Sequence, residues 1–148
     1  MISGPNKDKA LAKVFKTQVT ATFREADPAQ IMFFGNIFGW AHDTFEKWIL
    51  EAGYQWKDWF KNNQLMVPIR HTSADYTKPF YPGETYQVEA CVKTFGMTSF
   101  TMKYVFSSSL GAHAIVEMVH VVLDGKTHQP IPVPESIRQK FSPYLETP

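Results

Sequence analysis

The sequence predicts an α+β fold in which one antiparallel, five-stranded sheet wraps around a single long helix. One 16-residue segment repeats its apolar side chains at helical spacing, whereas five other segments alternate or run apolar as strands do. The last four of these strands are separated by short turn signals, and short connections favour antiparallel neighbours. The apolar side of the helix needs a cover, which a curling sheet provides.

The first strand is predicted over residues 17–24, a stretch that is rich in β-branched residues and alternates in polarity. Asp27-Pro28 follows this stretch. Because proline has no amide hydrogen and a fixed φ angle, we expect the strand to end before it.

The long helix is predicted over residues 36–51. Its apolar stripe consists of Ile37, Ala41, Phe45, Trp48 and Ala52. Asn36 is the expected N-cap, because its side chain can accept hydrogen bonds from amides two or three residues further on. Gly53 lies where a glycine is expected to end the helix.

Four further strands and two short helices are predicted in the rest of the chain. The strands cover residues 66–76, 85–95, 98–107 and 112–123, and the short helices cover residues 55–61 and 134–144. The last strand is almost continuously apolar, which predicts burial of both its faces in the middle of the sheet. His113 and His120 have opposite parity on that strand, so we expect them to face opposite sides.

The chain is long enough for one domain with its own core. We expect residues 1–16 to form a mobile N-terminal arm and residues 17–148 to form the domain. A net charge of +1 gives no broad field for nucleic acid or acidic membranes, so neither is an expected partner. The N-terminus lacks the apolar core of a secretory signal, no segment is apolar enough to span a bilayer, and Cys91 is the only cysteine. These features predict a cytoplasmic protein.

The segment most informative about chemistry is DPAQIMFFGN, residues 27–36. It places the Asp27 carboxylate about one turn ahead of a helix start, among apolar residues. The first amides of a helix have no partner within it, and the helix dipole attracts developing negative charge. A carbonyl directed at the amides of Phe34, Gly35 or Asn36 would be polarised as in an oxyanion hole. The same local sequence also fits a purely structural role, in which Asp27 only caps the turn before Pro28.

Residues 23–53 resemble the signature region of the 4-hydroxybenzoyl-CoA thioesterase family, whose members have the hotdog fold. That signature combines an Asp-Pro-Ala stretch, an aromatic pair, an asparagine at the helix start and a tryptophan four residues later. The matching residues are Asp27, Pro28, Ala29, Phe33, Phe34, Asn36 and Trp40. The order of strands and turns downstream also agrees, so the resemblance extends from about residue 18 to the C-terminus.

The resemblance implies an acyl-CoA thioesterase, which hydrolyses its substrate to a free acid and coenzyme A. Asp27 would be the catalytic carboxylate, acting as a nucleophile on the thioester carbonyl or as a general base on water. Backbone amides near Phe34 and Gly35 would polarise the carbonyl. The resemblance also implies a homodimer or homotetramer with the active site at the subunit interface, and no cofactor, since coenzyme A is part of the substrate.

Two departures from the family pattern lie next to the aspartate. Gln30 stands where the family usually has glycine, so either the loop adopts a conformation that a side chain tolerates or Gln30 offers the substrate a polar group. Phe34 stands where other branches of the family have histidine or tyrosine, which removes a polar side chain but leaves the backbone amide. The candidate substrate-binding residues are Gln30, Phe33, Asn36 and His42. His42 also fits a purely structural interpretation, as a solvated or locally bonded histidine on the helix surface.

Two other functions fit the same sequence. The protein could act on acyl groups carried by an acyl-carrier protein, or it could bind an acyl thioester without hydrolysing it. The five histidines show no metal-ligand spacing and no Gly-x-Ser-x-Gly motif is present, so neither a metal nor a serine nucleophile is expected. Thioester hydrolysis by a carboxylate is the leading hypothesis.

Overall fold

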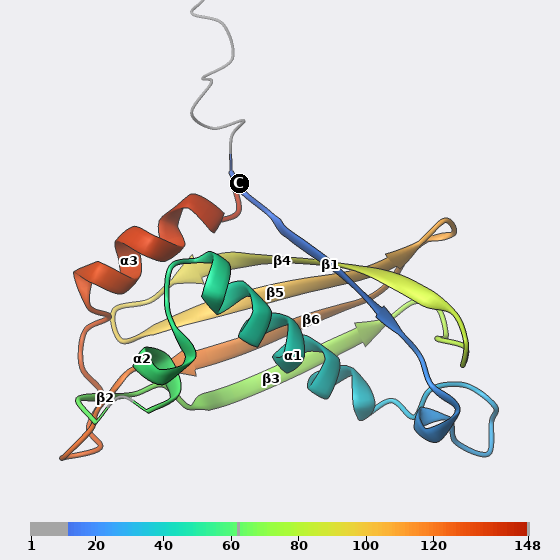
Figure 1. The fold of residues 1–148 in the computed structure, drawn as a ribbon, viewed down its shortest axis with the longest axis horizontal. Coiled ribbons are helices and arrows are strands. Elements are labelled where there is room, and N and C mark those ends of the chain that lie inside the picture. The colour runs from blue at the N-terminus through green and yellow to red at the C-terminus, as the bar shows by residue number, and fades with distance from the viewer. Residues whose placement is uncertain (1–11, 62, 148) are drawn as a thin grey trace, which may run out of the picture.

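The computed structural model describes residues 12–61 and 63–147, so most of the expected N-terminal arm, residues 1–11, lies outside the described residues. Within the described part, one sheet curves around helix α1 (Asn36–Glu51), which crosses one of its faces (Figure 1). This is the predicted α+β architecture.

The sheet has five strands in the order β1-β4-β5-β6-β3, and every neighbouring pair is antiparallel. In that order the strands are β1 (Phe15–Thr20), β4 (Thr85–Phe95), β5 (Ser99–Ser108), β6 (Gly111–Val121) and β3 (Ile69–Tyr76). β1 and β3 are therefore the two edge strands of the described chain.

Three predicted strands differ from the observed ones. The first begins two residues earlier and ends at Thr20, and a short 3-10 helix, η2 (Phe23–Glu25), follows it. The strand predicted over residues 66–76 is divided, because Pro68 cannot donate to a strand ladder. Its first part, β2 (Leu65–Met66), pairs instead with β7 (Leu123–Asp124) in a separate two-stranded ribbon. The strand predicted over residues 112–123 ends at Val121, and Leu123 belongs to the separate short strand β7.

Helix α1 has the predicted bounds, and all five residues of the predicted stripe are buried. Gly53 has a φ of 108° just beyond its end and donates to the Leu50 carbonyl, as expected for a terminal glycine. The predicted N-cap is wrong. Gly35 holds that position, whereas Asn36 is already helical and its side chain donates to the Glu25 carbonyl at 3.0 Å.

The prediction that both faces of β6 are buried is also wrong. Alternate residues such as Val116 and Met118 are buried on the side of α1, but Ile115 on the other face is 38 % exposed. The helix covers only one face of the sheet, so an apolar outer side chain remains partly open.

His113 and His120 are both buried, against the expectation from parity. The register between β5 and β6 shifts at this point: Phe106 pairs with Ala114, but Ser107 pairs with Ala112. A bulge of this kind inserts one extra residue and reverses the side-chain alternation. His113 is that residue, so the bulge brings both histidines to the inner face.

The remaining helices are short. They are α2 (Trp56–Phe60), α3 (Glu135–Phe141) and η3 (Ser142–Tyr144), so the single helix predicted over residues 134–144 is divided in two. In the described part of the chain, no helix combines the length and the hydropathy that a bilayer crossing requires.

Candidate active site

A ten-residue loop, residues 26–35, joins η2 to α1 and carries the predicted catalytic aspartate; we call it the Asp27 loop. The Asp27 amide donates to the Ile31 carbonyl at 2.9 Å, and the Gln30 amide donates to the Asp27 carbonyl at 2.9 Å. Ala26 and Met32 form a bridge across the base of this turn. The loop is thus closed on itself immediately before the helix begins.

The Asp27 carboxylate is half-buried and is oriented by its own turn. Its Oδ1 atom accepts a hydrogen bond of 2.8 Å from the Ala29 amide, whereas Oδ2 accepts none from the described residues. Asp27 therefore does cap its own turn, which was the structural alternative to a catalytic role. The bond uses one oxygen, and the second oxygen has lone pairs left for water or a substrate.

Gln30 adopts a φ of 65°, in the left-handed region that glycine tolerates best. The loop thus keeps the backbone conformation that suits the glycine usual in the resembled family. Holding a side chain there costs about 1 kcal/mol. The departure at Gln30 is therefore accommodated with local backbone strain.

The amides of Phe34 and Gly35 are the predicted carbonyl-polarising groups. Neither donates a hydrogen bond to any described residue, whereas the next amide, that of Asn36, donates to the Phe33 carbonyl at 3.0 Å. Both unpaired amides stand at the start of the 16-residue helix α1, where the helix dipole favours negative charge. They are the free donors that an oxyanion hole requires.

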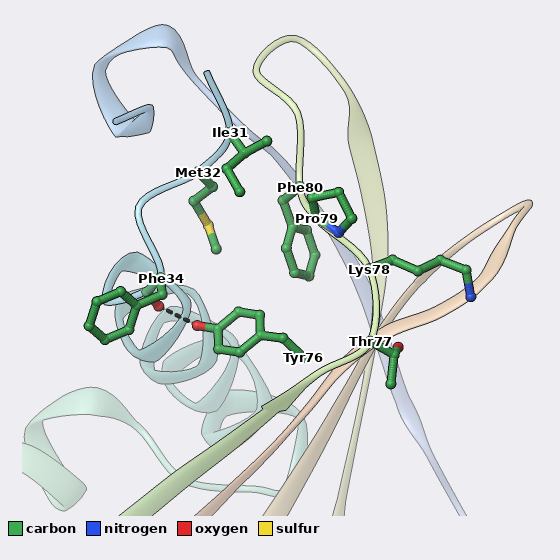
Figure 2. A pocket seen from close by; sticks show the side chains of 8 residues that line it. All are labelled: Ile31, Met32, Phe34, Tyr76, Thr77, Lys78, Pro79 and Phe80. Carbon is green, nitrogen blue, oxygen red and sulfur yellow. Dashed lines mark hydrogen bonds between the residues drawn. The ribbon is translucent and has the colours of Figure 1, made fainter. Parts of the chain in front are cut away.

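Tyr76, at the end of β3, fixes the orientation of one of these amides. Its hydroxyl donates to the Phe34 carbonyl, as Figure 2 shows. The Phe34 carbonyl and the Gly35 N–H belong to one planar peptide group, so holding the first also holds the second. Burial raises the pKa of Tyr76 to about 12, which keeps its hydroxyl protonated and donating at neutral pH.

A cavity of about 330 Å³ lies between the Asp27 loop and the chain that follows β3. Figure 2 shows its two walls, which are formed by Ile31, Met32 and Phe34 on one side and by Tyr76, Thr77, Lys78, Pro79 and Phe80 on the other. The Asp27 side chain is not among these eight lining residues, although it begins the loop that forms one wall. The cavity is mainly apolar, and Phe34 in its wall lies just before the start of α1.

Glu25 holds the Asp27 loop against the helix, and the sequence analysis did not single it out. Its carboxylate accepts from the Trp40 indole at 2.6 Å and from the Thr22 amide at 3.0 Å. Its carbonyl accepts from the Phe33 amide at 2.7 Å as well as from the Asn36 side chain. The spacing Thr22-x-x-Glu25 is a capping-box pattern that could have identified it. No local pattern points to Tyr76, because its contact spans 42 residues.

The other predicted binding residues fall in two places. The Phe33 ring packs on the Phe34 ring at 4.7 Å, and both are exposed on the Asp27 loop. The Asn36 side chain is occupied by its bond to Glu25. His42 lies further along α1, where it pairs with Glu46 at 3.4 Å and lines a different cavity.

Known proteins resemble this chain over most of its length. A 1,4-dihydroxy-2-naphthoyl-CoA hydrolase of Synechococcus elongatus is 25 % identical over 125 residues, which cover 84 % of this chain and 92 % of the relative. The enzyme of the same name from Nostoc punctiforme is 26 % identical over 128 residues, which cover 86 % of this chain and 84 % of the relative.

Among solved structures, a 1,4-dihydroxy-2-naphthoyl-CoA thioesterase from Synechocystis superposes with a TM-score of 0.79 at 17 % identity, covering 88 % of this chain and 96 % of the other. That similarity establishes the hotdog fold. The sequence profile of the thioesterase-like superfamily matches residues 21–141, which include the Asp27 loop, α1 and most of the sheet. The chain is therefore a member of the thioesterase-like superfamily with the hotdog fold.

Proposed function

We propose that this acyl-CoA thioesterase hydrolyses an aromatic acyl-CoA, with Asp27 as its catalytic carboxylate. The observation that carries the proposal is the pair of unpaired amides, Phe34 and Gly35, at the start of α1, in the same loop as a carboxylate with one free oxygen. A group that attacks a carbonyl and donors that stabilise the resulting oxyanion are the two requirements of acyl transfer.

In this mechanism the thioester carbonyl oxygen accepts hydrogen bonds from the Phe34 and Gly35 amides. Asp27 either attacks the carbonyl carbon, giving an acyl-aspartate that water then hydrolyses, or removes a proton from an attacking water. In both routes the C–S bond breaks, the acyl carbon gains a water-derived oxygen, and the coenzyme A thiolate takes up a proton. Tyr76 acts as a positioning residue, because it holds the peptide group of the Gly35 amide.

The curated relatives support an aromatic acyl group. Their names specify 1,4-dihydroxy-2-naphthoyl-CoA, and this thioester is the first substrate to test. The apolar walls of the cavity beside the Asp27 loop are compatible with an aromatic ring.

We propose further that the active site is completed by a second copy of the chain. β3 is an edge strand of the sheet, so its outer backbone groups lack a neighbouring strand in the described chain. Two β3 strands can pair antiparallel about a two-fold axis, which removes both exposed edges. The residues that flank this edge include the partly exposed Met66, Ile69 and Tyr76. A homodimer, or a homotetramer built from two such dimers, would enclose the cavity beside the Asp27 loop.

The test is release of coenzyme A by purified protein from a panel of thioesters: 1,4-dihydroxy-2-naphthoyl, 4-hydroxybenzoyl, benzoyl and palmitoyl. We expect the aromatic thioesters to be hydrolysed fastest. Asp27→Asn should lower kcat by about a thousandfold, because the amide is neither a nucleophile nor a base.

Asp43→Asn is the matched control, since it removes the same charge from an exposed position on α1. It should leave kcat unchanged. Wild-type turnover by the Asp27→Asn variant would refute the assigned mechanism. Tight binding of acyl-CoA without turnover would identify a binding protein. Faster cleavage of the same acyl group on acyl-carrier protein would identify the carrier protein, and not coenzyme A, as the natural acyl donor.

A further inference from the structure

A second cavity, of about 410 Å³, lies beside the middle of α1 and the start of β3. Its lining includes His42, Phe45, Trp59, Met66, Ile69 and His120. It is larger than the cavity at Tyr76 and shares none of its lining residues. We call it the His120 cavity. An apolar cavity of about 150 Å³ is enough to hold a benzene ring, so this one has room for one or two fused rings.

The polar group at the wall of this cavity has no partner. His120 is 2 % exposed, and its ring is stacked between Phe45 at 4.5 Å and Phe100 at 4.9 Å. Neither of its ring nitrogens makes a hydrogen bond to any described residue. Natural proteins seldom leave a buried polar group unpaired, so an unpaired one indicates a function or a bound group.

His113 on the same strand shows the usual arrangement of a buried histidine. Its Nε2 atom lies 2.7 Å from the Ser108 hydroxyl, and its Nδ1 atom lies 2.9 Å from the Pro79 carbonyl. Both of its nitrogens are thus satisfied by the fold. Among the described residues, His120 has two stacked aromatic rings and no neighbour in hydrogen-bond geometry.

The His120 ring is neutral at any ordinary assay pH. Burial, with the nearby His42 ring as a smaller cause, lowers the pKa of His120 from 6.5 to about 3. The Val67 backbone lies near the ring as a polar neighbour and acts in the opposite direction, but its geometry falls outside that of a hydrogen bond to either nitrogen. A neutral imidazole carries one donor and one acceptor, so it can pair with a hydroxyl group in either direction, whereas a carboxylate could use only the donor.

We propose that the His120 cavity binds the aromatic part of the acyl group and that His120 recognises a hydroxyl substituent on that ring. This inference rests on the proposed function and adds to it the cavity and the residue that select a hydroxylated ring. Both ring nitrogens are covered in this structure, so the hydroxyl reaches them when a lining side chain moves. The exposed, flexible Met66 is suited to such movement.

The cavity lies within reach of a catalytic carboxylate in the proposed dimer. The eight residues of β3 span roughly 24 Å, with the His120 cavity at Ile69 and the Asp27 loop at Tyr76. Antiparallel pairing of two β3 strands about their centres places Ile69 of each copy opposite Tyr76 of the other. The cavity of one copy then adjoins the Asp27 loop of its partner.

The test compares benzoyl-CoA, 4-hydroxybenzoyl-CoA and 4-methoxybenzoyl-CoA as substrates of the full-length protein. We expect kcat/KM to favour the hydroxylated thioester over the unsubstituted one by about tenfold, because the hydroxyl pairs an otherwise unpaired group. In His120→Phe the ratio should fall to near unity. His113→Phe, assayed where it is folded, should keep the wild-type ratio.

A second measurement is independent of turnover. The same thioesters are bound to Asp27→Asn protein labelled with ¹⁵N-histidine, and the ring signal that disappears in His120→Phe identifies His120. The hydroxylated thioester should shift this signal and bind about tenfold more tightly than the unsubstituted one. If this preference persists while no thioester is hydrolysed by the wild type, the proposed function fails and the binding inference stands. Turnover without any hydroxyl preference, or an unmoved His120 signal, overturns the inference.

Discussion

The Trp40 indole donates a 2.6 Å hydrogen bond to the Glu25 carboxylate and so ties the segment before the Asp27 loop to the second turn of α1. The same glutamate accepts from the Phe33 amide and from the Asn36 side chain through its carbonyl. One residue thus fixes both ends of the segment that carries the catalytic candidate. Preorganisation of this kind would keep the candidate carboxylate and the unpaired amides of the proposed oxyanion hole at a constant separation.

The bond between Glu25 and Trp40 should be measurable as an interaction energy. Glu25→Gln replaces one acceptor oxygen with an NH₂ donor, so the side chain can no longer accept from both Trp40 and Thr22. Trp40→Phe removes the indole donor. We expect each variant to lose stability and the double-mutant cycle to give a coupling of about 1–2 kcal/mol in urea unfolding. Strictly additive losses would mean that the bond does not stabilise the fold. Glu25→Gln should also lower kcat, since the loop loses an anchor.

Tyr76→Phe should lower kcat by about tenfold and change KM little. The hydroxyl orients the Gly35 amide through the Phe34 carbonyl, and an oxyanion donor acts mainly in the transition state. Tyr81→Phe, at an exposed tyrosine in the neighbouring segment, is the control. Steady-state kinetics on one thioester separates the two parameters. A rise in KM at constant kcat would instead assign Tyr76 to substrate binding.

Gln30→Gly should stabilise the protein by about 0.5–1 kcal/mol, because it relieves the left-handed strain at a φ of 65° while adding some freedom to the unfolded chain. Thermal unfolding measures the change. Ala29→Gly, at a neighbouring position without positive φ, should destabilise. If KM also rises in Gln30→Gly, the side chain contacts the substrate, which was the second role considered for this residue.

The two buried histidines should respond in opposite ways to replacement by phenylalanine. His113→Phe leaves the Ser108 hydroxyl and the Pro79 carbonyl without their partner and should cost about 2 kcal/mol. His120→Phe removes an unpaired polar group between two aromatic rings and should be neutral or stabilising at pH 7.5. Equal losses in urea unfolding would show that His120 has a partner in the free protein.

The same variant should remove a pH dependence. Because the pKa of His120 is about 3 in the folded chain and near 6.5 when unfolded, the unfolded state binds a proton first as the pH falls. Stability is therefore lost below about pH 6.5 and down to pH 3. Between pH 7.5 and pH 5 the wild type should lose about 2 kcal/mol that His120→Phe retains. Parallel stability curves for the two proteins would contradict the lowered pKa.

Mixed dimers should show which chain supplies each part of the site. Asp27→Asn protein should keep only about a thousandth of wild-type turnover. In the proposed dimer, mixing it with His120→Phe protein would create a site that combines an intact Asp27 with an intact His120 from different chains. The preference for 4-hydroxybenzoyl-CoA over benzoyl-CoA should then rise towards the wild-type ratio as Asp27→Asn protein is added. A ratio fixed at the His120→Phe value would place Asp27 and His120 of each site in one chain.

Local patterns in the sequence determined the fold class, the bounds of α1 and the position of the Asp27 loop. The 3.6-residue period of the helix and the alternation of the strands arise from the backbone geometry of short segments, so they can be read without knowing the neighbours. The stripe from Ile37 to Ala52 was predicted and is buried for that reason.

Only the tertiary structure decided which polar groups meet. The bulge at His113, the bond from Tyr76 to Phe34 and the unpaired ring of His120 all depend on segments far apart in the chain. Asn36 shows the same limit: its side chain suits an N-cap, but the Glu25 carbonyl lies close enough to take its hydrogen bond. Periodicity is local, whereas hydrogen-bond partners are set by packing, and packing brings together residues that no short window of sequence contains.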